Sequence, residues 1–448
     1  MLAHRIASHR IASVTCCLAL ACAEPVDTSD EVLPRALIEQ AVEIIVAPEA
    51  QALYQADPSA QQDLASLTAD LARNSLNFGL LDGANGKHRI RVTFTGKASV
   101  EDLPDDAEEF AGGPMTEETT SPDASDPEIV SWTTVHVQTG NEFTVEFPRS
   151  VLRENGIRAE DQGLHLGSEK ADEGELSDRG WSGGVDTRIL RGTHNVAQTN
   201  VAFEKLVDFN FNCSGTLVGP KHIVTAAHCI RDEFNSGWDS GTTLAGRSGT
   251  AWRATASFHP SDPSQATWYW VPTNYINLTN GENGVTWPAT PWDIGVIVTH
   301  SSRMGDVVGW MGWFWWSSDT SFQNRTHVNR GYAGCSTAIT NDPAQCGTFP
   351  NALWGDTASC DVLASTGSEV SNDSDGINRR FRMACDVSAG HSGSATYHTF
   401  TDGTLAVTGI ASWEHCTTCS SGDTRPNTSV RMTKIYSDTI ASLRTTFP

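Results

Sequence analysis

The hydrophobic and polar positions follow different patterns before and after about residue 185. In the front part, two segments repeat apolar residues at helical spacing, namely 35–46 and 61–76. Three segments alternate as strands do, with a typical Thr-Gly-Asn turn between the last two: 88–95, 129–137 and 142–147. The front part is therefore expected to fold as a mixed α/β module.

Beyond residue 185 the helical spacing gives way to short β-type runs separated by Gly, Asn, Asp and Pro. The clearest runs are 213–218, 222–225, 294–299, 381–385 and 405–413. Many short strands with frequent turns predict an all-β barrel or sandwich. Helical spacing returns only over 430–443, which predicts one C-terminal helix on a β body.

The front part is also much more acidic than the rest. The chain has a formal net charge of −24, and residues 24–180 hold 32 acidic against 11 basic side chains. Such a surplus disfavours nucleic acid as a partner, because phosphate binding needs Lys and Arg. Two parts with such different surfaces are expected to have different roles.

The first residues have the pattern of an export signal. Two arginines precede the apolar stretch 11–21, which ends in the cleavage pattern Ala19-Leu20-Ala21. We therefore expect removal of residues 1–21 and secretion, to the extracellular space or the periplasm. Lipid attachment at Cys22 is the alternative, although Ala19 stands where lipoprotein signals usually have leucine. No later apolar run is long enough to span a membrane.

The sharpest motif is Thr-Ala-Ala-His228-Cys229, which directly follows the apolar pair Ile223-Val224. A disulfide from Cys229 back to Cys213 would hold the histidine loop rigid, with a stabilisation of roughly 3 kcal/mol for a loop of that size. A general base needs this rigidity, because a small misplacement costs orders of magnitude in rate. A lone histidine is usually structural, but the whole string favours His228 as a general base.

Two further motifs supply the partners that such a base needs. Gly390-His-Ser392-Gly393 places a serine on a glycine-framed turn, which suits a nucleophile. Pro-Trp-Asp293-Ile-Gly places a carboxylate just before an apolar strand, where it can be held beside an imidazole and orient it. An Asp at a strand start is usually only a turn residue, and the position between the other two motifs makes Asp293 the candidate.

These strings, in the order His, Asp, Ser, resemble the motifs of the trypsin/chymotrypsin-like serine proteases. Ser-Gly-Ser at 392–394 and Gly-Val-Asp-Thr-Arg at 184–188 are similar to the bacterial glutamyl endopeptidase-like branch. The resemblance implies two six-stranded antiparallel β-barrels, with His228 and Asp293 from the first and Ser392 from the second. It also implies a triad that acts through an acyl-enzyme, and an oxyanion hole from the N–H groups of Gly390 and Ser392. No metal and no cofactor are expected.

Several neighbours depart from the family pattern. His391 stands where trypsin has an Asp that captures the new amino terminus, so that activation switch is absent. Glutamyl endopeptidases carry a histidine before the tryptophan of the channel strand, whereas this chain has Ser412 before Trp413, which argues against a glutamate preference. Four residues are expected to line the substrate pocket: Asp386, Ser412, Trp413 and Glu414. The two acids among them tilt the prediction slightly towards basic side chains.

Eight of the eleven cysteines lie in the back part, which predicts up to four disulfides in an oxidising compartment. Besides Cys213 with Cys229, the expected pairs are Cys360 with Cys385 and Cys335 with Cys346. Cys416 and Cys419 form either a local bridge or the ends of two longer ones, and zinc is disfavoured because no second ligand pair accompanies them. The tryptophans at 268–292 and 310–316 are expected in packing rather than in substrate binding.

The chain is therefore expected to be a preproenzyme with a signal (1–21), an acidic prosegment (22–180) and a trypsin-like serine protease domain (181–448). Its expected partners are protein or peptide substrates and its own prosegment, as an intramolecular inhibitor or chaperone. Cleavage between about Lys170 and Arg188, for example at Arg179-Gly180, would release the mature enzyme. Two alternatives stay open: a non-catalytic binding protein on the same scaffold and an esterase with the same triad.

Overall fold

A computed structural model of the chain describes the following residues: 33–77, 89–101, 129–153, 203–207, 212–232, 236–248, 251–262, 267–280, 285–299, 302–332, 353, 360–363, 371–373, 376–385, 387, 390–400, 405–413 and 427–448. Several sequence predictions fall outside them and stay predictions: the signal, Cys22, the cleavage region 170–188, Asp386, Glu414, Cys335, Cys346, Cys416 and Cys419.

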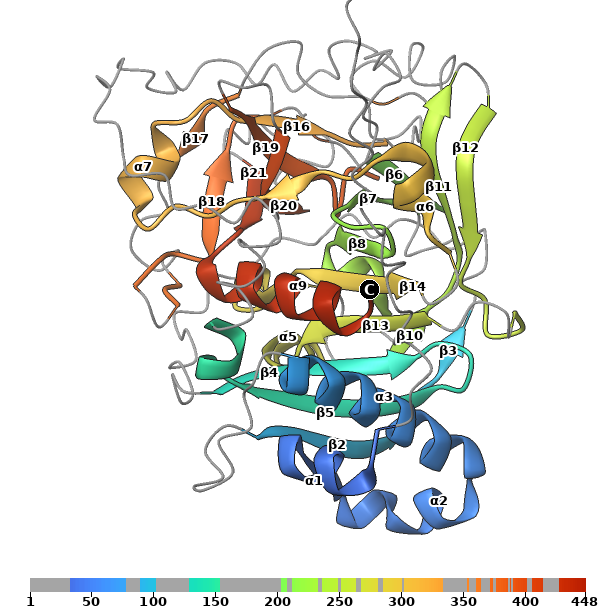
Figure 1. The fold of residues 1–448 in the computed structure, drawn as a ribbon. Coiled ribbons are helices and arrows are strands. Elements are labelled where there is room, and N and C mark those ends of the chain that lie inside the picture. The colour runs from blue at the N-terminus through green and yellow to red at the C-terminus, as the bar shows by residue number, and fades with distance from the viewer. Residues whose placement is uncertain are drawn as a thin grey trace, which may run out of the picture.

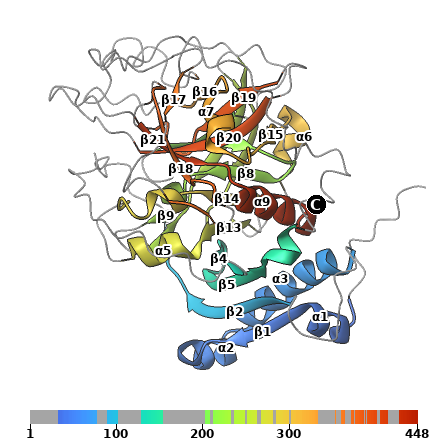
Figure 2. The same cartoon turned by 90° about the vertical axis from the view of Figure 1, so that its left-hand side faces the viewer.

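Residues 33–153 form a mixed α/β unit, which we call the N-terminal module (Figures 1 and 2). Its elements are α1 (Arg35–Ala41), β1 (Val42–Val46), η2 (Pro48–Ala50), α2 (Gln51–Ala56), α3 (Pro58–Asn77), β2 (Ile90–Lys97), β3 (Val100–Glu101), β4 (Ile129–His136) and β5 (Asn141–Pro148). The helix predicted over 61–76 is confirmed within α3, and the strands predicted over 88–95, 129–137 and 142–147 are confirmed as β2, β4 and β5.

The helix predicted over 35–46 is wrong in its second half. The helix ends at Ala41, and Val42–Val46 is strand β1, which pairs in parallel with β2 and sets Val42 opposite Ile90. Four of these five residues are β-branched, which favours an extended backbone. The pairing with a strand far along the chain, which local spacing cannot reveal, then decides the conformation.

Residues 203–448, which we call the body, are mostly β and confirm the predicted fold class. The first group of body strands is β6 (Phe203–Val207), β7 (Cys213–Leu217), β8 (His222–Thr225), β9 (Arg231–Asp232), β10 (Gly237–Asp239), β11 (Thr242–Ser248), β12 (Ala251–Ser257), β13 (Thr267–Pro272) and β14 (Gly295–Thr299). Short helical segments between or beside them are η3 (Ala227–Cys229), α5 (Thr273–Thr279), η4 (Thr290–Trp292) and α6 (Met304–Val308).

One sheet runs from the module into the body without a break. Within the described residues it has 11 strands in the order β1-β2-β5-β4-β13-β14-β8-β7-β6-β11-β12. The junction is the antiparallel pair of β4 and β13, in which His136 faces Trp268 and Trp132 faces Pro272. The sequence predicts a first barrel made of body strands alone. In the structure these strands share their sheet with the module, because module strand β4 pairs with β13.

A second sheet lies on the other side of the body, with 7 strands in the part of the chain that the structure describes. They are β15 (Gly312–Trp313), β16 (Val328–Arg330), β17 (Val362–Leu363), β18 (Arg380–Met383), β19 (Ala395–Thr399), β20 (Leu405–Trp413) and β21 (Asn427–Arg431), with α7 (Asp319–Gln323) before β16. The predicted C-terminal helix is present as α9 (Lys434–Thr446). It begins later than expected, because β21 extends to Arg431 and pairs with β18 and β20.

The main hydrophobic core crosses the boundary between module and body. A single cluster of buried side chains contains Leu67 of α3, Trp132 of β4, Trp270 of β13 and Leu443 of α9. A smaller cluster around Phe314, Trp316 and Phe381 packs against the second sheet. Since buried apolar area is the main stabilising term in folding, module and body share their principal source of stability.

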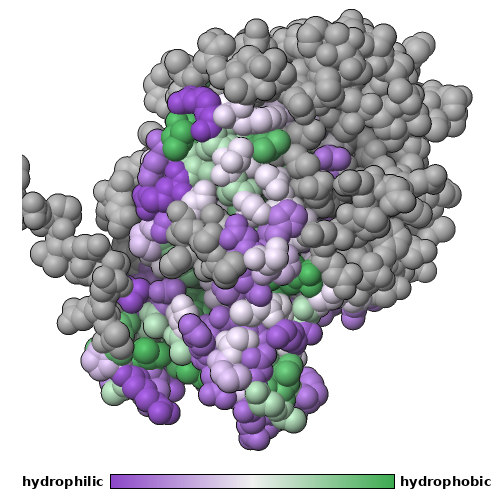
Figure 3. All heavy atoms as spheres, turned by 90° about the vertical axis from the view of Figure 1, so that its right-hand side faces the viewer, coloured by the Kyte–Doolittle hydropathy of each residue, from purple (hydrophilic) through white to green (hydrophobic). Residues whose placement is uncertain are grey.

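The surface of the described residues is mixed. In the view of Figure 3, hydrophobic side chains are scattered among hydrophilic ones rather than gathered in one patch. The large hydrophobic residues that are exposed are Ile44, Ile129, Val307 and Trp310. Among the described residues, no helix combines the length and hydrophobicity that crossing a membrane requires.

Candidate active site

His228 lies in η3, directly after the buried strand β8. Its neighbour Cys229 forms the expected disulfide with Cys213 at the start of β7. The histidine therefore sits on a turn that is anchored by a strand on one side and by a covalent bond on the other. Only 8% of the residue is exposed, so its ring is held among protein atoms rather than in free solvent.

Asp293 caps η4 and leads into β14, at the same end of the sheet as His228. This proximity follows from the antiparallel pair of β14 and β8, which sets Gly295 opposite Thr225. Asp293 Oδ1 accepts a 2.9 Å hydrogen bond from the backbone N–H of His228, and Asp293 Oδ2 lies 2.7 Å from His228 Nδ1. A carboxylate in this place holds the proton on Nδ1, so Nε2 is the nitrogen that can accept one.

Ser412, near the end of β20, contacts the same carboxylate. Its hydroxyl donates a 2.6 Å hydrogen bond to Asp293 Oδ2, and both residues are buried. The sequence predicts Ser412 in the substrate pocket and carries no sign of its contact with Asp293. Asp293 thus receives donors from the histidine backbone, the imidazole and the second sheet, which is how proteins hold a buried charge.

The turn that carries Ser392 packs against the strand that carries Cys213. The backbone N–H of Ser214 donates to the carbonyl of Ser392 (2.7 Å), and the Ser214 hydroxyl donates to the carbonyl of Gly390 (2.7 Å). The same hydroxyl accepts a 2.8 Å hydrogen bond from the backbone N–H of Tyr332. Sequence reasoning missed Ser214, although its position next to Cys213 was a usable signal.

The two glycines that frame Ser392 both have left-handed backbone, with φ of 86° at Gly390 and 81° at Gly393. A Cβ atom on Gly393 would lie 2.1 Å from Thr225 Oγ1 and 2.2 Å from the carbonyl oxygen of Ser214. Only glycine allows this approach. The serine turn therefore packs closely against Thr225, the last residue of β8, which precedes His228 by three residues.

The residues beside this site are mostly packed. His391 is buried, and Trp413 is half-buried at the end of β20. The tryptophans at 268, 270, 287, 313 and 316 are buried, as expected for packing, and Trp310 is exposed. Trp292, directly before Asp293, lies under the guanidinium of Arg379, whose central carbon is 4.0 Å from the ring centre.

Tyr436 of α9 supports the segment that leads to Asp293. Its hydroxyl donates a 2.8 Å hydrogen bond to the carbonyl of Pro291. Burial, the largest effect on this group, raises the pKa of Tyr436 above its usual range, so the hydroxyl stays protonated as a donor. The sequence carried no signal for this contact.

Three groups of the kind that bind metals lie together among the described residues. The ligand atoms of Cys213, His228 and Cys229 are all within 4.8 Å of one another. The two sulfur atoms are bonded to each other, however, and zinc needs thiolates. The other disulfide predicted among the described residues, Cys360 with Cys385, is also present.

No protein-family model matches the chain. The chain is 30% identical over 130 residues to a glutamyl endopeptidase of Bacillus licheniformis, which is 29% of this chain and 35% of that protein. It is 37% identical over 92 residues to serine protease 23 of Homo sapiens, which is 18% of this chain and 24% of that protein. The matches thus span about a third or less of these relatives' lengths.

A solved structure of a Glu endopeptidase in complex with MPD aligns with 58% of this chain and 94% of its own, at a TM-score of 0.39 and 18% identity. A structural similarity this low carries no argument about the fold, which the strand pairings describe by themselves. The two sequence matches support the resemblance that the motifs indicated. Over the matched segments the chain is similar to a glutamyl endopeptidase and to serine protease 23.

Proposed function

We propose that this chain is a serine endopeptidase in which Ser392 is the nucleophile, His228 the general base and Asp293 the residue that orients the imidazole. The observation that carries the proposal is the double contact of Asp293 with the backbone and the ring of one histidine. It lies beside a glycine-framed serine turn that hydrogen bonds and close packing attach to the neighbouring strands.

In the proposed reaction, Ser392 Oγ bonds to the carbonyl carbon of the scissile peptide while His228 Nε2 takes the hydroxyl proton. The N–H groups of Gly390 and Ser392 stabilise the oxyanion that forms. The C–N bond then breaks, and the imidazolium returns its proton to the leaving amine. A water molecule repeats the sequence on the acyl-enzyme and restores the free serine.

The proposal includes export and synthesis as a proenzyme. The basic and apolar start with its cleavage pattern supports secretion, and the acidic front part before the family-like segment 184–188 supports a prosegment. The catalytic chain should then begin between about residues 170 and 188. N-terminal sequencing of that chain, separated under denaturing conditions from active material, tests this, and a start before residue 163 would contradict it.

Active-site labelling tests the chemistry. A fluorophosphonate probe, applied to processed protein and followed by peptide mass spectrometry, should label Ser392 and should not label the Ser392→Ala variant. Ser394→Ala is the matched control, because the Ser394 hydroxyl is buried and donates to Asn329 Oδ1 at 3.0 Å. Absence of label on Ser392 would favour the alternative of a non-catalytic binding protein on this scaffold.

Cleavage profiling separates a peptidase from an esterase. A peptide library should be cut at internal peptide bonds, whereas an esterase would cut only matched ester substrates. The same profile reads the side-chain preference, for which the sequence points slightly towards basic residues through Asp386 and Glu414. Of the residues expected to line that pocket, Ser412 and Trp413 are described.

A further inference from the structure

The N-terminal module is joined to the body by much more than the connecting peptide at 154–202. We propose that it remains bound to the body as a noncovalent subunit after that peptide is cut, with the outer edge of β13 as its permanent binding surface. The mature protein would then consist of two chains that share one sheet. The inference goes beyond the proposed activity and can be tested on an inactive variant.

The first support is the backbone ladder between β4 and β13. Five residue pairs face each other along it, from Trp268 opposite His136 to Pro272 opposite Trp132. It is extended by a 2.9 Å hydrogen bond from the N–H of Val137 to the carbonyl of Thr267. Without the module, β13 would become an edge strand with unpaired backbone groups, which invites aggregation.

The second support is the aromatic packing across this ladder. Trp268 lies against the rings of His136 (4.8 Å between ring centres) and Phe143 (5.9 Å). Trp270 lies between Phe147 of the module and Phe447 at the C-terminus. All six residues of β13 are buried. Departure of the module would uncover the ring of Trp268 and one side of Trp270, and large exposed aromatic rings are unusual on a stable soluble surface.

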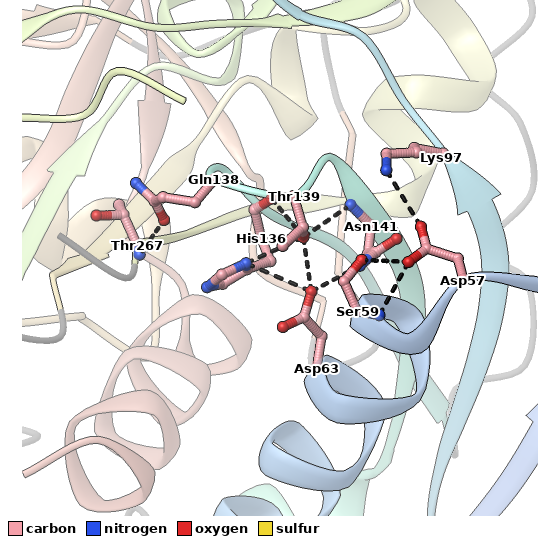
Figure 4. A network of polar contacts seen from close by, with 9 residues as sticks. All are labelled: Asp57, Ser59, Asp63, Lys97, His136, Gln138, Thr139, Asn141 and Thr267. Atoms are coloured by element: carbon pink, nitrogen blue, oxygen red, sulfur yellow. Dashed lines mark hydrogen bonds and ion pairs between the residues drawn. The ribbon is translucent and has the colours of Figure 1, made fainter. Parts of the chain in front are cut away.

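The third support is a polar network that holds the docking edge in shape (Figure 4). The carboxylate of Asp63 on α3 accepts hydrogen bonds from Thr139 (2.6 Å), on the turn between β4 and β5, and from Asn141 (2.7 Å), the first residue of β5. His136 Nδ1 lies 3.0 Å from the Thr139 hydroxyl. The turn then presents Gln138, whose Oε1 accepts a 2.9 Å hydrogen bond from the backbone N–H of Thr267. The edge is therefore organised before it meets the body.

Two more contacts between module and body lie outside the ladder. On one side, β3 pairs with β10, and Trp238 Nε1 donates to Glu142 at 2.9 Å. On the other, α3 lies against α9, and Asn74 Nδ2 donates to Thr446 Oγ1 at 2.9 Å (Figure 1). Contacts spread over such separate points resist dissociation together, because all must break before the module can leave.

The location of the module is compatible with its staying in place. β13 also pairs with β14, the strand that follows Asp293, so the module completes the sheet that holds the candidate base and carboxylate. The ring of module residue Trp132 packs edge-on against Tyr436 (6.3 Å), whose hydroxyl binds the carbonyl of Pro291. In Figures 1 and 2 the module lies at the opposite end of the molecule from the second sheet, which carries Ser412. A module that stays bound therefore stabilises the sheet that carries the candidate site.

The experiment uses the full chain with Ser392→Ala, in which a recognition sequence for an added specific protease replaces residues 176–182. After complete cutting, native mass spectrometry and size-exclusion chromatography should find both fragments in one 1:1 complex in native buffer. Separation should require denaturant. The proposal is overturned if the fragments separate in native buffer and the larger one remains folded and monodisperse. Because the variant is inactive, this outcome says nothing about the proposed peptidase activity.

A pair of substitutions on α3 sharpens the test. Asn74→Ala in the cut complex removes the hydrogen bond to Thr446 and should raise the dissociation constant several-fold to about tenfold. It is measured as the surviving complex after serial dilution at one fixed denaturant concentration that dissociates the parent complex in part. Ser66→Ala, on the exposed face of the same helix, should leave it unchanged. Equal values for both variants and the parent would show that the α3 contact does not hold the module.

Discussion

The Ser412 hydroxyl donates to Oδ2 of Asp293, the same oxygen that faces His228 Nδ1. A strand of the second sheet thus fixes the carboxylate that orients a histidine of the first. The contact therefore joins the two sheets of the body at the candidate site.

Ser412→Ala should therefore lower kcat about tenfold or more with a smaller change in KM. A hydrogen bond to a charged group contributes about 1.5–3 kcal/mol, and each 1.4 kcal/mol in the barrier is a factor of ten in rate. Steady-state kinetics on a peptide substrate measure it. Ser429→Ala is the control, because Ser429 is buried on the neighbouring strand β21 and its hydroxyl faces the sulfur of Met383. Equal losses in both variants would contradict a special role for Ser412.

Gly393→Ala should reduce activity at least a hundredfold, because its Cβ would collide with Thr225 and Ser214 and displace the serine turn. Gly309→Ala separates this collision from backbone strain. Gly309 also has positive φ (84°), but nothing lies within 4 Å of a Cβ there. We expect that control to lose roughly 1–3 kcal/mol of stability, because its φ of 84° and ψ of 171° suit only glycine, and to keep its kcat. Activity and thermal midpoint of both variants decide the matter.

Replacing both cysteines of one disulfide by serine should affect stability and activity differently at the two bridges. The bridges close similar spans, 16 residues for Cys213–Cys229 and 25 for Cys360–Cys385, so each loss should cost roughly 3 kcal/mol. Only the first bridge anchors the turn of His228, so only its loss should also lower kcat at least tenfold under folding conditions. Matched kcat values in the two double variants would argue against that anchoring role.

The body should lose stability in mild acid through its buried histidines. Burial lowers the pKa of His222 to about 3, and burial likewise lowers that of His327 to about 3. Between the unfolded pKa near 6.5 and these values, the unfolded chain binds protons that the folded chain refuses, so stability falls as pH falls. Each histidine should contribute about 1.4 kcal/mol per pH unit in the free energy of unfolding.

Denaturant unfolding of the inactive Ser392→Ala chain at several pH values between 6 and 4 measures this slope. His222→Gln can keep the hydrogen bond to the carbonyl of Leu443 and should reduce the slope by about one histidine's share. Ser66→Ala, which removes no titratable group, should leave the slope unchanged. If His222→Gln does not alter the slope, His222 is not a source of the loss of stability in acid.

Local patterns were sufficient for elements whose conformation and burial agree with their own spacing. The amphipathic spacing of α3 and the alternation of β2 and β5 reflect one buried face each. Strand β4 was also found from its pattern, although its residues 132–135 are all buried. Local patterns failed at β1, where a distant parallel partner overrides helical spacing, and at β13, whose residues are buried on both faces and therefore do not alternate.

The candidate chemistry was also visible in the sequence, because a nucleophilic serine, a base on a rigid turn and a carboxylate before a strand each demand particular neighbours along the chain. What the chain alone could not reveal are the contacts across it: Ser412 on Asp293, Ser214 under the serine turn, and the module strand β4 on β13. These depend on which strands lie side by side, and residues more than a hundred positions apart become neighbours only when the sheet forms. The sequence by itself thus determined the types of residue and their order, whereas the tertiary structure decided which of them touch.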